Sequence, residues 1–175
     1  MKEYSTKDVR NVVLLGATKS GKTSLAEAML FEGKVIDRRG TVEDKNTVSD
    51  NNELEKLNQR SIYATPLYAE FMGKKINIID APGSDDFIGG AVSASKVCEN
   101  GILVVNAQQG VEVGTRGMIR FAEEYKLPLI VAVNQCDADK ADWDLVENSL
   151  KEVLGKKYVA VQFPTSVGAG FDGFV

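Results

Sequence analysis

Residues 16–23 carry the most specific chemical pattern in this chain. They read G-A-T-K-S-G-K-T and fill every fixed position of G-x-x-x-x-G-K-[ST]. In such a loop, glycines let backbone N–H groups approach phosphate oxygens, and the N-terminus of the following helix favours anions. Lys22 would neutralise the β- and γ-phosphates, and the Thr23 hydroxyl would bind Mg²⁺. The pattern predicts a nucleotide site in which Lys22 counts as a catalytic residue.

The neighbours of Lys22 in this loop are expected to contact the nucleotide as well. The expected contact residues are Thr18, Lys19, Ser20, Gly21, Lys22, Thr23 and Ser24. An apolar run at residues 12–15 predicts a buried strand before the loop, and residues 24–31 predict a helix after it. The alternative is a glycine-rich turn without chemistry, and the correct flanks on both sides disfavour it.

A second pattern, D-A-P-G, occupies residues 80–83 and follows the predicted strand at residues 76–79. An aspartate at a strand end can hold Mg²⁺ directly or through water, so the expected metal ligands are Thr23 and Asp80. Gly83 can present its amide to the γ-phosphate. Taken alone, D-x-x-G is also compatible with an ordinary turn. Its place at the end of the third strand favours the nucleotide interpretation.

A third pattern, N-Q-C-D, follows the apolar run at residues 129–133 and favours guanine. The Asp137 carboxylate can accept hydrogen bonds from N1–H and the 2-amino group of guanine, and adenine offers neither donor. Asn134 would tie the loop together and touch the base. Gln135 stands where N-K-x-D has lysine, and its shorter, uncharged side chain is expected to cover the base less well. Asn and Asp as plain turn formers are the alternative.

Composition excludes several classes of protein. With 175 residues the chain is expected to form one domain, and 43% hydrophobic with 26% charged residues is typical of a soluble globular protein. The net charge of −4 gives no case for autonomous nucleic-acid binding, and no apolar stretch is long enough to span a membrane. Cys98 and Cys136 are interpreted as reduced thiols of a cytoplasmic, monomeric protein. The chain has no histidine, which excludes histidine-based acid–base catalysis and histidine metal ligands.

The elements expected to position these patterns alternate between strands and helices. The predicted strands are residues 9–16, 61–71, 74–80, 101–107, 127–133 and 158–162, and the predicted helices are residues 22–31, 88–99, 113–125 and 141–154. This order predicts an α/β, three-layer P-loop NTPase domain resembling a small GTPase. Its sheet would have six strands, mostly parallel, with one antiparallel strand joined by a hairpin at residues 72–74. Residues 33–59 hold few apolar side chains and are expected to form a long functional loop that is mobile without ligand.

Together these patterns resemble the GTP-binding domain of an elongation factor G-like translational GTPase. The matching segments are Arg10-Asn11, residues 21–25, Val48-Ser49-Asp50, residues 80–83 with Asp86-Phe87, residues 110–112 with Thr115, and residues 134–137. The resemblance implies GTP or GDP and Mg²⁺ as cofactors. It also implies the ribosome as partner of the full-length factor, and two loops, 41–63 and 80–90, that respond to the γ-phosphate.

Two departures from this family bear on hydrolysis. The family places a water-positioning histidine where this chain has Ser84, and the loss of such a group typically lowers the rate by about 10²–10⁴-fold. The family also reads R-G-I-T, with a Mg²⁺-binding threonine, where Tyr63 stands here. Thr47, Ser49 or Thr65 could supply that hydroxyl instead. We therefore expect a guanine-nucleotide switch with slow or partner-dependent hydrolysis.

Two other functions stay open at this point. A non-hydrolysing ribosome-docking module that binds nucleotide weakly or not at all is favoured by Ser84 and Tyr63. An ATP-using kinase or motor is disfavoured by Asp137.

The C-terminal residues resemble the family's segment that leads into an inserted subdomain. The segments in question are residues 162–166 and 171–175. The chain is accordingly expected to be a fragment of a larger multidomain factor, with the last guanine motif, S-A-x, beyond it. The other placement of that motif is Ser166-Val167-Gly168.

Overall fold

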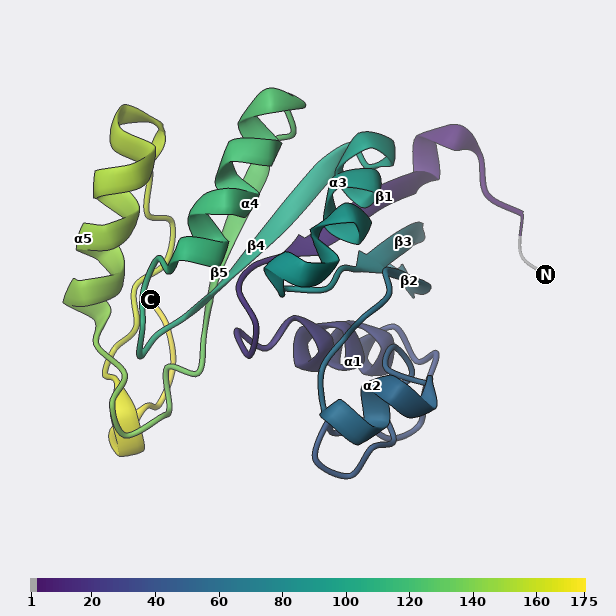
Figure 1. The fold of residues 1–175 in the computed structure, drawn as a ribbon, viewed down its shortest axis with the longest axis horizontal. Coiled ribbons are helices and arrows are strands. Elements are labelled where there is room, and N and C mark those ends of the chain that lie inside the picture. The colour runs from purple at the N-terminus through teal and green to yellow at the C-terminus, as the bar shows by residue number, and fades with distance from the viewer. Residues whose placement is uncertain (1–2) are drawn as a thin grey trace.

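A five-stranded sheet in the order β2-β3-β1-β4-β5 forms the middle layer of the computed structural model, which describes residues 3–175 (Figure 1). Its strands are β1 (Val9–Leu15), β2 (Thr65–Phe71), β3 (Lys74–Asp80), β4 (Asn100–Asn106) and β5 (Leu129–Asn134). All neighbouring pairs are parallel except β2 with β3, which form the predicted hairpin. The predicted α/β fold with one antiparallel strand is confirmed.

Helices cover both faces of the sheet. The helices are α1 (Lys22–Glu32), α2 (Glu53–Asn58), α3 (Ile88–Val97), α4 (Val113–Glu124) and α5 (Trp143–Leu154). Residues of α3, α4 and α5 share one apolar core with Val13 and Leu15, whereas α1 packs on Leu14 and Ile78 (Figure 1). Because successive strand residues face opposite sides, β1 contributes to both cores.

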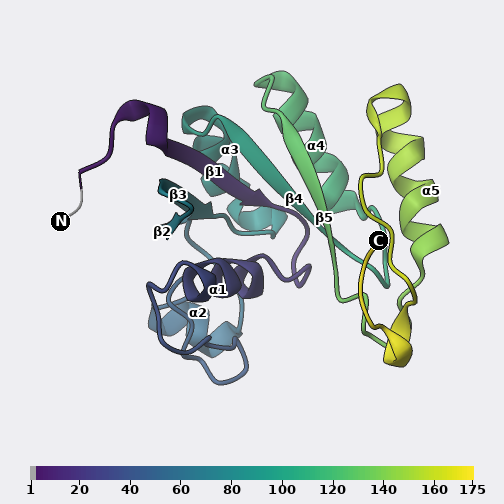
Figure 2. The same ribbon diagram turned by 180° about the vertical axis from the view of Figure 1, so that it is seen from behind.

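The predicted sixth strand at residues 158–162 is wrong. Val159 and Val161 are exposed, and the segment lies beside β5 without pairing to it (Figure 2). The next residue, Phe163, makes other contacts. Its ring packs edge-on against Trp143, with ring centroids 5.9 Å apart, and its backbone pairs with Val175. Residues 163–165 and 173–175 therefore form a short hairpin in place of a β5 ladder.

Several other boundaries differ from the sequence-based expectation for local reasons. Strand β2 begins at Thr65 rather than residue 61, since the backbone N–H groups of Ile62 and Tyr63 donate to the Glu55 carboxylate. Helix α5 begins after Asp142, whose side chain accepts from Leu145 N at 3.0 Å as an N-cap. Helix α2 lies inside the segment that was expected to be a loop.

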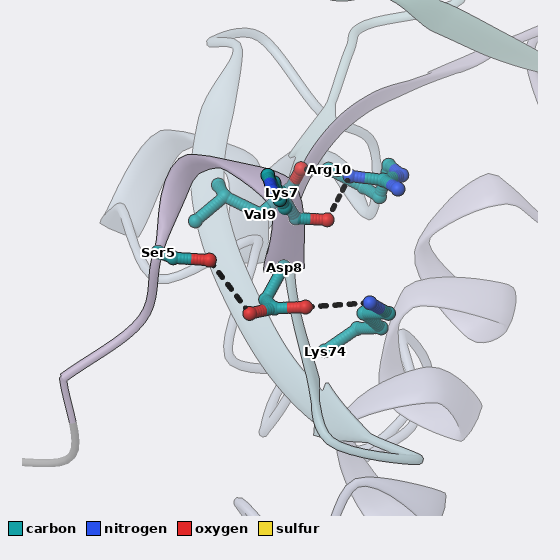
Figure 3. Close-up of polar contacts among 6 residues, drawn as sticks. All are labelled: Ser5, Lys7, Asp8, Val9, Arg10 and Lys74. Carbon is teal, nitrogen blue, oxygen red and sulfur yellow. Dashed lines mark hydrogen bonds and ion pairs between the residues drawn. The ribbon is translucent and has the colours of Figure 1, made fainter.

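A polar cluster fastens the N-terminal residues to the β2–β3 hairpin (Figure 3). The Asp8 carboxylate accepts from Lys74 Nζ at 2.5 Å and from Ser5 Oγ at 2.8 Å, and these hydrogen bonds lower its pKa. The Arg10 guanidinium donates to the Lys7 and Val9 carbonyls. The cluster lies at the amino end of β1, away from the predicted site. Among residues 3–175, no helix has the length and apolar character needed to cross a membrane.

Candidate nucleotide-binding site

The predicted chemical patterns meet at the carboxyl edge of the parallel strands. Residue Leu14 of β1 pairs in register with Asp80 of β3, and Asn106 of β4 pairs with Asn134 of β5. Parallel strands end at one edge of a sheet, so the loops after β1, β3 and β5 converge there. A cavity of about 530 Å³ opens at this edge.

Nine of the predicted site residues line this cavity and four do not. The lining residues are Thr18, Lys19, Gly21, Lys22, Thr23, Ser24, Gly83, Ser84 and Gln135. Those that do not line it are Ser20, Asp80, Asn134 and Asp137. A larger cavity of about 930 Å³ lies along the outer side of β5, but it holds none of the predicted residues. The smaller cavity is therefore the candidate site.

Local backbone geometry shapes the phosphate loop. Gly21 has φ +94° and caps α1, whose first residue is Lys22. A Cβ atom at Gly21 would lie 2.0 Å from Asn134 Nδ2, so any larger residue there would displace Asn134. The loop and helix positions predicted from sequence are thus occupied as the pattern requires.

Lys22 is buried at the centre of the loop. Its Nζ donates to the Ala17 carbonyl at 2.8 Å, and only 5% of the residue is exposed. Burial lowers the pKa of Lys22 to about 8, although Asp80, Asp50 and Glu112 act to raise it. A phosphate anion would compensate this buried charge better than a carbonyl does.

Asp80 is a buried carboxylate with only one of its oxygens satisfied. Its Oδ2 accepts from Thr23 Oγ1 at 2.8 Å and from Ser49 Oγ at 2.7 Å. Its Oδ1 has no hydrogen-bond partner among residues 3–175, and burial raises the pKa of this carboxyl group. An unpartnered carboxylate oxygen beside a threonine hydroxyl fits a hard divalent cation such as Mg²⁺.

Asp50 is a candidate site residue that the sequence interpretation did not assign. Its residue is 4% exposed, and its Oδ1 has no hydrogen-bond partner within the described chain. Burial raises the pKa of Asp50 to about 6, opposed by a hydrogen bond with Ser61. The segment Val48-Ser49-Asp50 is one of those that match the family, and this match is the sequence feature that could have pointed to Asp50. Only the fold shows that it reaches the cavity.

The structure separates the three hydroxyls that could replace the family's threonine. Ser49 is the one that contacts Asp80. Thr47 Oγ1 accepts from Asp50 N at 3.3 Å, and Thr65 Oγ1 donates to the Ser49 carbonyl at 3.2 Å. Tyr63 is 52% exposed. Described residues 3–175 contain no cluster of three or more His, Cys, Asp or Glu able to hold a metal ion. A cation here would therefore depend on hydroxyls, on these isolated carboxylates and on phosphate oxygens.

The base-recognition loop is tied to the phosphate loop through its amides. Asn134 Nδ2 donates to the Ser20 carbonyl at 3.0 Å, and Gln135 Nε2 donates to the Lys19 carbonyl at 3.1 Å. Asp137 lies in the exposed turn that follows. Gly168 N donates to the Cys136 carbonyl at 2.8 Å, which places residues 166–168 against this loop. The Ser166 hydroxyl donates to the Gly170 carbonyl and residues 166–168 do not line the cavity, so the placement of the S-A-x motif stays a prediction.

Ser84 is one of the residues that line the cavity. Its Oγ donates to Asp86 Oδ2 at 3.3 Å.

The fold and the site together define a P-loop GTP-binding domain. The model of the elongation factor Tu GTP-binding domain family matches residues 7–174, and the chain belongs to this family. The expected resemblance to an elongation factor G-like GTP-binding domain is thereby confirmed.

Three relatives illustrate the similarity. An "Elongation factor G-like protein" of Thermotoga maritima is 38% identical over 168 residues, which are 96% of this chain and 24% of that protein. A protein of the same description from Mycobacterium tuberculosis is 31% identical over 160 residues, covering 91% and 22% of the two chains. The crystal structure of ttk003000868 from Thermus thermophilus superimposes with a TM-score of 0.89 at 31% identity, covering 95% and 25%. The chain thus spans about a quarter of the length of these relatives.

Proposed function

We propose that this domain is the GTP/GDP switch of a longer, elongation factor G-like translation factor that acts on the ribosome. Its hydrolysis of GTP is slow or depends on a group supplied by a partner. The proposal includes a monomeric domain in the cytoplasm and Mg²⁺ as the accompanying cation. The relatives described as elongation factor G-like proteins support the ribosome as partner.

The loops that carry Lys22, Asp80 and Asn134–Asp137 converge at one edge of the sheet, and this convergence carries the proposal. In this arrangement the Lys22 ammonium exchanges the Ala17 carbonyl for phosphate oxygens, and backbone N–H groups of the loop donate beside it. The Asp137 carboxylate reads the guanine edge. This leaves adenine disfavoured, because a carboxylate placed for two donors would find none.

The buried hydroxyls and carboxylates would hold the cation. The hydroxyls of Thr23 and Ser49 both donate to Asp80 Oδ2, and Asp50 lines the cavity together with Thr23. Mg²⁺, when bound, neutralises phosphate charge and orients the β- and γ-oxygens. Ser49 sits in the long loop after α1, so its contact with Asp80 links that loop to the state of the site.

Calorimetric titration of the chain with GDP, GTP and ATP in the presence of Mg²⁺ tests this function. Binding of both guanine nucleotides without ATP is the expected result. Asp137→Asn provides the matched variant, because it removes the acceptor of two donors and should abolish the preference for guanine. Equal binding of ATP would contradict the proposal and favour a kinase or motor.

A non-hydrolysing docking module is the second candidate, and the orientation of the Ser84 hydroxyl toward Asp86 favours it. Ser84→His distinguishes the two candidates when GTP hydrolysis is followed with and without ribosomes. A gain on the order of 10²–10⁴ would show that the remaining machinery is intact. An unchanged rate, with guanine nucleotide still bound, would support the docking module.

A further inference from the structure

Asn106 and Gln135 form an amide pair across the ends of β4 and β5. Gln135 Oε1 accepts from Asn106 Nδ2 at 2.9 Å, while Gln135 Nε2 donates to the Lys19 carbonyl at 3.1 Å. Asn106 is 6% exposed, and it is the register partner of Asn134. One glutamine side chain therefore bridges the end of β4 and the phosphate loop.

The orientation of Asn106 is fixed from its other side. Its Oδ1 accepts from the backbone N–H of Gln108 at 2.8 Å, so the amide nitrogen must face Gln135. Position 135 consequently needs an acceptor toward Asn106 and a donor toward Lys19. A glutamine amide supplies both, whereas a lysine ammonium has three donors and no acceptor.

The bridge also sets the direction of the phosphate loop. The carbonyls of Lys19 and Ser20 are held by Gln135 and Asn134 in turn. In a planar trans peptide the N–H points opposite to the carbonyl, so the N–H groups of Ser20 and Gly21 point away from the base loop. The Gly21 N–H is a donor of the kind that a phosphate-binding loop needs, whereas the Ser20 N–H donates to the Ala17 carbonyl at 3.3 Å in this structure.

We propose that Asn106 and Gln135 are a coupled pair of positioning residues that fix the phosphate loop against the base-recognition loop. The pair couples a neutral amide at position 135 to an amide at position 106, so that neither can be changed to a charged residue alone. This inference rests on the proposed guanine-nucleotide function and deepens it, since it names what joins the phosphate-binding and base-binding parts of the site.

A double-mutant cycle with exchange of charge tests the coupling. The variants are Gln135→Lys, Asn106→Asp and the two combined, each titrated with Mg²⁺–GDP by calorimetry. Gln135→Lys leaves the Asn106 donor facing an ammonium and is expected to weaken GDP binding by about tenfold. Asn106→Asp leaves a carboxylate facing the Gln135 oxygen and is expected to weaken it by a similar factor.

The double variant is expected to restore affinity to within about threefold of the unmodified chain. A carboxylate at position 106 still accepts from Gln108 N, and an ammonium at position 135 can donate both to it and to the Lys19 carbonyl. Two residues that act independently of one another give no rescue. If Asn106→Asp alone does not fold while the double variant does, the same rescue is demonstrated.

The thermal midpoints of the four nucleotide-free chains keep this inference separate from the proposed function. Rescue of the thermal midpoint in the double variant supports the pair even if no nucleotide binds. The absence of nucleotide binding would contradict only the proposed GTP switch. Additive losses in the double variant, or a Gln135→Lys chain that matches the unmodified chain in both measurements, would overturn the coupling.

Discussion

The phosphate loop and the loop between α1 and β2 border the same cavity, but different forces hold them. Residues 16–23 owe their shape to glycine backbones between a buried strand and a helix. Residues 33–64 owe theirs to two buried glutamates, Glu27 and Glu55, which are each 1% exposed. The first loop takes its backbone shape from its own glycines, and Asn134 and Gln135 hold two of its carbonyls, whereas the second loop depends on side chains whose hydrogen bonds cross it.

The two glutamates act as acceptors for backbone N–H groups. Glu27 accepts from Gly40 N at 2.8 Å and from Val48 N at 2.6 Å, which fastens the first half of the loop to α1. Glu55 accepts from Ile62 N at 3.0 Å and Tyr63 N at 3.1 Å, and it completes a capping box with Asn52. The segment therefore has a defined conformation here, and its mobility without ligand stays a prediction.

This difference between the two loops predicts how a single substitution acts in each. A change in the phosphate loop should alter binding with little effect on the fold, because the strand and helix on either side persist. A change at a buried glutamate should release a whole segment, because it leaves several backbone N–H groups without their acceptor.

Lys22→Ala should weaken GDP and GTP binding by about 10²–10³-fold, since it removes the buried cation that would face the phosphates. The unfolding midpoint should change little, because burial already disfavours the charged form of this lysine. Calorimetry and thermal unfolding measure the two effects. Exposed Lys34→Ala, just beyond α1, is the control. If the variant keeps its affinity within threefold, Lys22 does not contact the nucleotide.

Glu27→Ala should lower the free energy of unfolding by about 2 kcal/mol, because two backbone N–H groups lose the buried carboxylate that accepts from them. Urea unfolding measures this loss, and hydrogen exchange should increase at residues 40–50. Glu32→Ala, an exposed change on the same helix, should leave both unaltered. If residues 40–50 keep their protection in Glu27→Ala, other contacts hold this loop.

Gly83→Ala should weaken nucleotide binding by about tenfold, a factor that corresponds to about 1.4 kcal/mol. The added Cβ would lie 2.5 Å from Lys22 Nζ and 2.7 Å from the Gly16 carbonyl oxygen, so the lysine or the loop must shift. Gly89→Ala is the matched control, since nothing lies within 4 Å of a Cβ there. Equal affinities of the two variants would show that residues 80–83 do not constrain the phosphate loop.

Asp50 should give the smallest effect, a pH dependence of stability. Burial raises its pKa to about 6, above that of the unfolded chain, so the folded state binds the proton more tightly. This contribution to stability is present at low pH and is lost as pH rises through about 6. Asp50→Asn should therefore stabilise the nucleotide-free chain more at pH 7.5 than at pH 5. Exposed Asp44→Asn serves as control, and a difference that does not change with pH would contradict the assignment.

Much of the fold follows from local patterns. The strand at residues 9–15, the loop and the helix from Lys22 were predictable, because apolar runs and glycines act through neighbouring residues. The strand predicted at residues 158–162 is absent. Its alternating pattern is compatible with pairing, but it does not reveal that Phe163 packs against Trp143. Helix α2 was not predicted, because its capping box lies in a polar segment without an apolar stripe.

The sequence alone predicts the phosphate loop, the strand before it and the helix after it, and the family to which the chain belongs. The packing of distant segments brings Ser49 to Asp80 and Asp50 to the cavity, lets Glu27 and Glu55 hold the long loop, and pairs Asn106 with Gln135. The physical reason is the distance along the chain over which each interaction acts. Backbone preference is read from adjacent residues, whereas a buried carboxylate or amide takes its partners from whichever segment the packed core brings beside it.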